Sequence, residues 1–312
     1  MGLDAKQRKL ADRILELKGE KNAVILAHNY QRPEIYEVAD HVGDSYDLSV
    51  KATKSDAEII VFCGVRFMAE TAKILNPGKK VLLPALGAGC TMASMMDASA
   101  ARAWKAKYPD ASSVCYINTN ADVKAEFDAC CTSANSVKVA GSMPARRVLF
   151  GPDQNLAQYT QEQLDAKGID KEIIPWNGFC YAHTAISAQQ LAEAMKLRPD
   201  AEVIAHPECK KEIRDMAHYV YGTGGMVKRA GESDAKEFII GTEIGMCERL
   251  ARDYPGKKFM AAPNSGTCAF MKKTTLQNTL DALEKEQHEV NVPQEIAGRA
   301  RACIGKMLEI GK

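Results

Sequence analysis

The 312-residue chain lacks several features that mark common functional classes. Its 41 Lys and Arg residues are balanced by 40 Asp and Glu residues, so the net charge of +1 gives no electrostatic basis for binding nucleic acid or a membrane surface. No segment approaches the roughly 18 consecutive apolar residues of a membrane span. The N-terminal segment is charged and amphipathic, without the apolar core of a signal peptide. We therefore expect a cytoplasmic protein in which any anion binding is local.

Common cofactor motifs are also absent. No Gly-x-Gly-x-x-Gly follows a strand-like segment, and Gly-Thr-Gly-Gly-Met at 222–226 is too short, which disfavours a nicotinamide dehydrogenase. The ten cysteines include no Cys-x-x-Cys pair of the kind that structural zinc sites use, and no ferredoxin-type run. Cys130 and Cys131 are adjacent, which is too close for such a pair. Most of these thiols are expected to be buried structural residues.

Three cysteines differ from the others in their surroundings and spacing. Cys90, Cys180 and Cys268 are 90 and 88 residues apart, and each lies in a loop of small residues just after a strand-like segment. Glycine-bearing loops of this kind allow the backbone to approach a ligand closely. These three are candidate ligand-binding thiols.

Two further signals repeat with the same period. One is a pair of polar residues at the end of a β-branched segment, and the other is a hydroxyl residue before a helix-like segment. The pairs are His28 with Tyr30, Tyr116 with Asn118, and His206 with Glu208; the hydroxyls are Ser45, Ser133 and Thr223. Three signals in register predict a domain copied three times, each copy supplying one thiol, one polar pair and one hydroxyl to a common centre.

Strand-like and helix-like patterns alternate along the whole chain, which predicts an α/β fold with short parallel sheets. We expect three similar αβα domains, comprising residues 1–97 with 285–312, 98–188 and 189–284. The polar pairs and cysteines would then lie at the carboxyl ends of strands, where open α/β sheets bind ligands. Within this pattern we expect helices over 33–42 and 210–220, a strand-like segment at 137–142, and two terminal helices packing on the first unit.

These residue types allow specific chemistry. Three thiolates fit a 4Fe–4S cluster whose fourth iron has no protein ligand and acts as a Lewis acid, although spacing alone favours three unconnected loop cysteines. The hydroxyls are either plain helix N-caps or part of a site for carboxylate or phosphate. Glu208 lies between an apolar segment and a cysteine, so we expect burial to raise its pKa and suit it to proton transfer. His183 could support the Cys180 loop.

At these residues the chain closely resembles the quinolinate synthase (quinolinate synthetase A) family. The matching segments span nearly the whole chain and include AHNYQRPEIYEVADHVGDS, FCGVRFMAETAKIL, YINTNADVKA, CTSAN, GPDQNLAQY, WNGFCYAHT and AHPEC. The resemblance implies an iron–sulfur transferase of NAD biosynthesis, with its domains around a pseudo-threefold axis and the active site at the centre. Such an enzyme condenses iminoaspartate with dihydroxyacetone phosphate to quinolinate, releasing phosphate and water.

The resemblance also implies roles for individual residues. Cys90, Cys180 and Cys268 would hold one 4Fe–4S cluster per chain. Proton transfer would fall to Glu208, Tyr30, His28 and His206. The substrate-contacting set would be His28, Ser45, Tyr116, Asn118, Ser133, His206, Glu208 and Thr223. Two segments depart from the family pattern: 222–226, often Ser-Thr-Ser-Gly-Met, keeps one hydroxyl, and Cys268 precedes Ala-Phe-Met instead of Pro-Asn-Met.

Two alternatives remain open from the sequence. A hydro-lyase with an open cluster would use the same Lewis acid on a hydroxy acid, without dihydroxyacetone phosphate. A non-catalytic iron–sulfur sensor would not need Glu208. If the resemblance holds, the partners are small molecules, with functional coupling to an L-aspartate oxidase or dehydrogenase that produces the unstable iminoaspartate.

Overall fold

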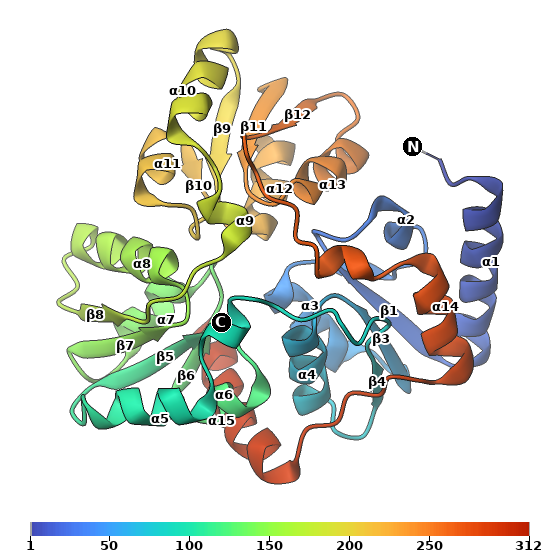
Figure 1. The fold of residues 1–312 in the computed structure, drawn as a ribbon, viewed down its shortest axis with the longest axis horizontal. Coiled ribbons are helices and arrows are strands. Elements are labelled where there is room, and N and C mark those ends of the chain that lie inside the picture. Colours follow the sequence, from blue (N-terminus) through green and yellow to red (C-terminus); the bar gives the residue numbers. More distant parts are fainter. Residues whose placement is uncertain (1, 312) are drawn as a thin grey trace. The chain divides into compact units, whose positions relative to one another are not determined.

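The structure is a computed structural model that describes residues 2–311, and it contains three wholly parallel four-stranded sheets (Figure 1). The strands are, for the first sheet, β1 (Ala23–His28), β2 (His41–Gly43), β3 (Ile59–Cys63) and β4 (Lys80–Leu82); for the second, β5 (Ser112–Tyr116), β6 (Ala129–Cys131), β7 (Arg147–Gly151) and β8 (Glu172–Pro175); and for the third, β9 (Glu202–Ala205), β10 (Tyr219–Val220), β11 (Glu237–Gly241) and β12 (Lys258–Ala261). Each sheet has the same order, with its first strand between the second and the third. The predicted α/β fold of three similar αβα units is confirmed.

The chain forms two compact units. The first comprises the chain up to Cys90 together with Cys268–Ala297, and the second comprises Thr91–Thr267 together with the chain from Gly298. Each sheet lies inside one of the three predicted domain ranges, whose boundaries stay a prediction. Among the helices that the structure describes, none combines the length and the apolar character needed to cross a membrane.

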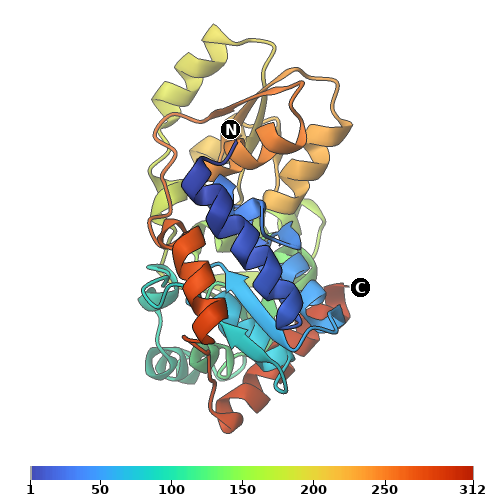
Figure 2. The same cartoon turned by 90° about the vertical axis from the view of Figure 1, so that its right-hand side faces the viewer.

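The first unit holds the first sheet between two helix layers. Its helices are α1 (Ala5–Glu20), α2 (Pro33–Tyr36), α3 (Ser45–Lys54), α4 (Arg66–Leu75) and α14 (Leu276–Lys285), with a 3₁₀ turn at Met271–Lys273. Helices α1 and α14 lie side by side on one face of the sheet (Figure 2), and α3 and α4 cover the other. Ile14, Ile25 and Leu283 are fully buried in the core between α1, β1 and α14. Because both faces are covered, β1 and β3 are almost continuously apolar, as buried parallel strands are.

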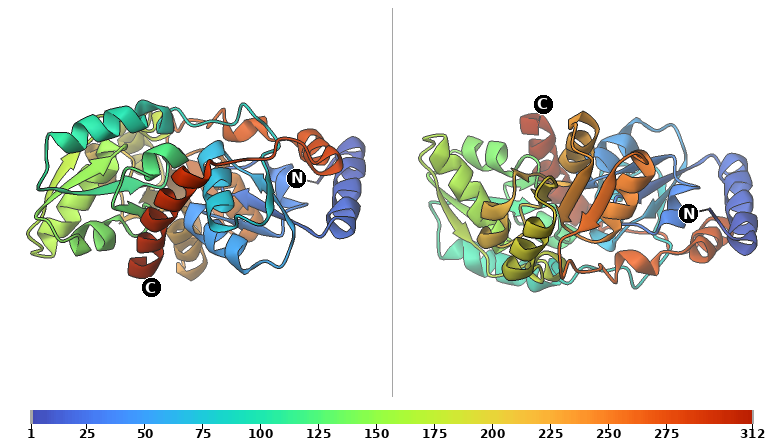
Figure 3. Two further views of the ribbon diagram at one scale, coloured as in Figure 1. Left: turned by 90° about the horizontal axis from the view of Figure 1, so that it is seen from below. Right: turned by 90° about the horizontal axis from the view of Figure 1, so that it is seen from above.

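The second unit holds the other two sheets. Its helices are α5 (Ala98–Ala106), α6 (Ala121–Lys124), α7 (Ser136–Ser142), α8 (Gln154–Ala166), α9 (Tyr181–Thr184), α10 (Ala188–Leu197), α11 (Lys211–Met216), α12 (Thr223–Glu232) and α13 (Gly245–Asp253), with a 3₁₀ turn at Ala93–Met95. Helix α5 lies across one face of the second sheet (Figure 3), while α7 and α8 pack on the other. The last helix, α15 (Gln294–Gly311), enters this unit at Gly298, and Cys303 lies 3.7 Å from Cys115 of β5. Of the two terminal helices expected on the first unit, α14 belongs to that unit, whereas α15 belongs to the second unit from Gly298 onward.

Three local predictions were wrong, and all concern short elements. The helices expected over 33–42 and 210–220 end at Tyr36 and Met216, and each is followed by a short edge strand, β2 or β10. The segment 137–142, expected to be strand-like, lies in α7. The edge strands have only two or three residues, too few to show the alternation of apolar and polar residues that marks a strand. Parallel pairing with β1 and β9 specifies them instead.

Candidate functional site

The polar pairs lie where the first strand of each sheet ends. β1 ends at His28, β5 ends at Tyr116, and His206 directly follows β9. In open parallel sheets this edge carries the ligand-binding residues. The alternation of strand and helix thus places all three predicted pairs at the same topological position in their sheets.

In the second unit, two of these pairs meet around one buried carboxylate. Glu208 is 2% exposed, and the Tyr116 hydroxyl donates a 2.6 Å hydrogen bond to its Oε1. His206 Nδ1 is 3.6 Å from Oε1, and the imidazole of His206 stacks on that of His183 with ring centroids 4.5 Å apart. The sequence therefore brings a phenol, a carboxylate and two imidazoles into one buried cluster.

His183 connects this cluster to the third sheet. Its Nε2 lies 2.8 Å from the Thr242 hydroxyl, just after β11. Its Nδ1 is 3.2 Å from Glu208 Oε2, an ion-pair distance without the alignment of a hydrogen bond. Donor atoms of Cys180, His183 and Glu208 lie within 4.8 Å of one another. A buried nitrogen without an aligned partner beside a thiol is typical of a site that receives a metal centre or a substrate.

The pKa of Glu208 differs from the sequence-based expectation. Burial alone would raise it, but His183, His206 and the Tyr116 hydroxyl outweigh burial and lower the pKa to about 2. The expectation of a raised pKa was therefore wrong, because two imidazoles and a phenol that are remote in sequence face the carboxylate. Glu208 is ionised at neutral pH and accepts hydrogen bonds.

A second buried carboxylate behaves in the opposite way. Asp153 is fully buried, and burial together with the nearby charge of Glu208 raises its pKa well above the usual range. Asp153 is the N-cap of α8, and it also accepts a hydrogen bond from the backbone N–H of Cys180. Sequence analysis missed this residue, although it lies in the segment GPDQNLAQY that carries the family resemblance.

The three predicted hydroxyls are not helix N-caps. Asp44, Asn135 and Gly222 hold the N-cap positions of α3, α7 and α12, while Ser45 and Thr223 are the first residues of α3 and α12. The alternative of a plain cap is therefore wrong. In the second unit, Ser133 lies close to Gly222. A Cβ atom added to Gly222 would be 2.7 Å from the hydroxyl oxygen of Ser133. The second and third hydroxyl segments are thus neighbours.

In the first unit, two lysines join the loops that carry the candidate residues. Lys272 Nζ donates to the carbonyl oxygen of Tyr30 at 2.7 Å, and Lys273 Nζ donates to that of Gly87 at 2.8 Å. Both lysines belong to the segment after Cys268. The ring of His28 meets that of Tyr30 edge-on, with centroids 4.7 Å apart. The Cys90 loop, the Cys268 loop and the His28–Tyr30 pair are therefore held together within this unit.

Exposure distinguishes the three candidate cysteines from most of the others. Cys90, Cys180 and Cys268 are partly exposed, whereas every other cysteine except Cys247 is buried. The hydroxyl of Tyr181 donates to the carbonyl oxygen of Thr267, so the Cys180 loop contacts the residue that precedes Cys268 in sequence. Cys90 and Cys268 belong to the first unit and Cys180 to the second, so a common centre for the three thiols stays a prediction.

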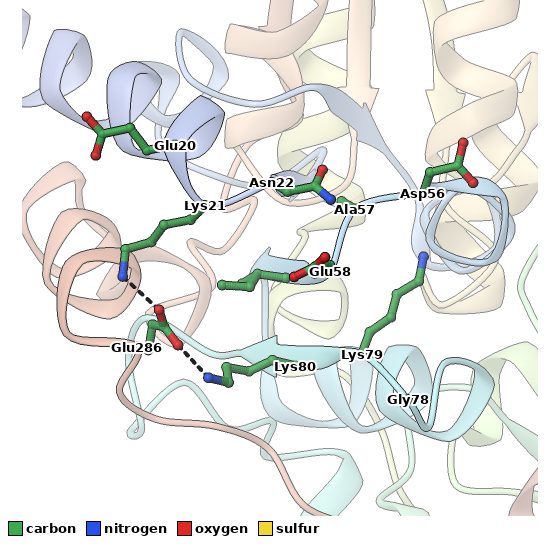
Figure 4. Close-up of a pocket in the computed structure, with 11 residues that line it drawn as sticks. Glu20, Lys21, Asn22, Asp56, Ala57, Glu58, Gly78, Lys79, Lys80 and Glu286 are labelled. Carbon is green, nitrogen blue, oxygen red and sulfur yellow. Dashed lines mark hydrogen bonds and ion pairs between the residues drawn. The ribbon is translucent and has the colours of Figure 1, made fainter.

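A cavity of about 760 Å³ lies in the first unit, near the amino ends of β1, β3 and β4 (Figure 4). Its lining includes three lysines and several carboxylates, and Glu286 pairs with both Lys21 and Lys80. None of the predicted site residues lines it. Because Glu286 pairs with two of its lysines and the cavity lies at the sheet edge opposite His28, it is not the candidate site.

Comparison with known proteins identifies the family. Residues 12–309 match the family described as Quinolinate synthetase A protein. The chain belongs to this family. Proteins named quinolinate synthase from Alkaliphilus metalliredigens, Methanoregula boonei and Dehalococcoides mccartyi are 49%, 48% and 48% identical to it. Each of these matches covers 96% of the chain and 98% of the quinolinate synthase. The predicted membership of the quinolinate synthase family is confirmed.

Proposed function

We propose that the chain is a quinolinate synthase that condenses iminoaspartate with dihydroxyacetone phosphate to quinolinate in NAD biosynthesis. The observation that carries this proposal is the buried cluster of Tyr116, His183, His206 and Glu208 beside Cys180. Condensation, ring closure and dehydration need several proton transfers in one cavity. A mixed phenol, imidazole and carboxylate lining supplies groups of different proton affinity for them.

Cys90, Cys180 and Cys268 would hold the 4Fe–4S cluster of this enzyme. Their partial exposure, their loops and the unaligned His183 Nδ1 near Cys180 fit such a group. When bound, the cluster supplies Lewis-acid chemistry through an iron that has no protein ligand.

Other residues of the chain would supply charge and transfer protons. Glu208, held ionised, accepts a hydrogen bond from the Tyr116 hydroxyl and places its negative charge beside the His183 imidazole. His206 and, in the first unit, His28 and Tyr30 would move protons on the substrate.

The segments that contain Ser45, Ser133 and Thr223 would bind the anionic groups of the substrates. Ser45 and Thr223 each begin a ten-residue helix, where backbone N–H groups and the helix dipole favour carboxylate or phosphate. Ser133 lies beside the start of α12, and Asn118 follows β5 in a partly exposed loop. We assign these four residues to binding of the substrate carboxylates and phosphate.

The proposal includes the setting of the enzyme. Its partners would be the two small-molecule substrates in the cytoplasm, with functional coupling to an L-aspartate oxidase or dehydrogenase because iminoaspartate is unstable. No nucleic acid or membrane takes part in this scheme.

The test is quinolinate formation by anaerobically purified, cluster-loaded protein supplied with iminoaspartate and dihydroxyacetone phosphate. Cys180→Ala is the test variant, and Cys247→Ala is the matched control because Cys247 is also partly exposed but lies in α13. We expect quinolinate from the wild type and from Cys247→Ala, and none from Cys180→Ala. An intact cluster with no quinolinate would overturn the substrate assignment and favour a hydro-lyase.

A further inference from the structure

Asp153 connects the candidate ligand loop to a rigid helix of the second unit. Its Oδ1 accepts the backbone N–H of Leu156 at 2.8 Å, which caps α8, and its Oδ2 accepts the backbone N–H of Cys180 at 3.1 Å. The side chain is fully buried. One carboxylate therefore joins the start of a thirteen-residue helix to the backbone of Cys180.

The backbone on both sides reinforces this connection. Asp153 forms an isolated parallel bridge with Gly178, and the N–H of Gln154 donates to the Gly178 carbonyl oxygen at 2.8 Å. Gly178 lies so close to the chain that a Cβ would be 2.5 Å from the carbonyl oxygen of Pro152. The segment before Cys180 is thus held against 152–154, and the Asp153 carboxylate binds the backbone of Cys180 itself.

We propose that Asp153 is a positioning residue that sets the orientation of Cys180 toward the cluster. This inference rests on the proposed ligand role of Cys180. With its N–H bound to Asp153, the Cys180 backbone has a defined direction, and so does the Cα–Cβ bond that carries the thiol. Residues that orient metal ligands by hydrogen bonds tune both affinity and electronic properties of the metal centre.

Two substitutions separate this role from helix capping. Asp153→Asn keeps one acceptor oxygen, which is enough to cap α8. Its NH₂ group replaces the second acceptor, so two hydrogen-bond donors face each other at the Cys180 N–H. Asp153→Ala removes both contacts. Asp97 is the matched control in the same unit, because it caps α5 by accepting from Ala100 N–H at 2.8 Å and lies on an exposed surface. Asp97→Asn and Asp97→Ala therefore change capping alone.

The experiment uses anaerobically reconstituted full-length protein. For each variant, iron and sulfide per chain, the electron paramagnetic resonance spectrum of the reduced cluster, kcat, KM and the thermal midpoint are measured. For Asp153→Asn we expect an altered spectrum and a fall in kcat of about 10- to 100-fold, with KM changed by less than about threefold. The Asp97 variants should retain the wild-type spectrum and kcat.

The outcomes distinguish this inference from the proposed function. A wild-type spectrum and kcat in Asp153→Asn would overturn the positioning role while leaving the quinolinate synthase assignment intact. An equal loss in Asp97→Asn would also overturn it, because capping alone would then explain the effect. Failure of the wild type to assemble a cluster would overturn the proposed function itself, and the ligand role of Cys180 with it. If Asp153→Ala does not fold, the result for Asp153→Asn alone tests the positioning role.

Discussion

At the scale of single residues, the second unit contains two buried carboxylates with opposite properties. His183, His206 and Tyr116 hold Glu208 ionised against the effect of burial, whereas burial and the charge of Glu208 raise the pKa of Asp153. Pairs of acids whose environments separate their pKa values are typical of catalytic sites. Glu208 therefore carries negative charge at neutral pH, whereas Asp153 accepts the backbone N–H groups of Leu156 and Cys180.

The charge of Glu208 can be tested by Glu208→Gln. The amide keeps an acceptor for the Tyr116 hydroxyl but removes the negative charge that faces His183 and His206. We expect the cluster to be retained and kcat to fall by about 10²- to 10⁴-fold. Glu202→Gln is the control, because Glu202 lies in β9 of the same unit but pairs with Arg229. Near-normal kcat in Glu208→Gln would remove Glu208 from the mechanism.

The same carboxylate predicts a dependence of stability on pH. Folding lowers the pKa of Glu208 from 4.5 to about 2, so its contribution to the free energy of unfolding is fully present above pH 4.5 and is lost as the pH falls toward 2. The contribution is on the order of 3 kcal/mol at most. Urea unfolding of the wild type and Glu208→Gln at pH 7 and pH 3 should show a smaller difference at the lower pH. An unchanged difference would contradict the lowered pKa.

At the scale of elements, sequence patterns predicted most of the strands and helices but not the short strands β2 and β10. β1, β5 and β9 are largely buried strands of four to six residues, whereas β2, β6 and β10 have only two or three residues and depend on pairing with them. The β-branched segment in α7 is helical because it packs on α8 and on the second sheet. Tertiary contacts outweigh weak local propensity in such short segments.

In the candidate site, too, some residues carry a sequence pattern and others depend on tertiary contacts. Its proposed cysteines, polar pairs and hydroxyls carry a sequence signal, because each recurs at intervals of 88 to 90 residues. Asp153 and Thr242 were not predictable, because they act through single hydrogen bonds to Cys180 and His183 and have no repeating pattern. The pKa of Glu208 was not predictable either, since it depends on His183 and Tyr116, which lie in other elements.

The start of α12 offers a test of the proposed anion-binding segments. Gly222→Ala places a Cβ 2.7 Å from the Ser133 hydroxyl oxygen, so either Ser133 or the first turn of α12 with Thr223 must move. We expect this displacement to weaken substrate binding by about 1.4 kcal/mol, which corresponds to a tenfold rise in KM for the phosphate-bearing substrate. Gly256→Ala is the control, because nothing lies within 4 Å of its Cβ position. Equal KM values in both variants would exclude this segment from substrate binding.

At the scale of the whole molecule, the chain passes between its two compact units at three points. These points are Cys90–Thr91, Thr267–Cys268 and Ala297–Gly298. Two of them contain proposed cluster ligands, Cys90 and Cys268. The third lies within α15, whose later residues complete the second unit.

The third crossing predicts that the second unit depends on the C-terminus. Ala300, Cys303, Ile304 and Met307 are buried, and burial of Ile304 and Met307 alone contributes about 3–6 kcal/mol. Deleting residues 298–312 should therefore lower the thermal midpoint by roughly 10–20 °C. It should also expose Cys115, which Cys303 contacts, to a maleimide reagent. Glu309→Ala, an exposed position on the same helix, is the control. A truncated chain with the wild-type midpoint and an unreactive Cys115 would show that the second unit is complete without α15.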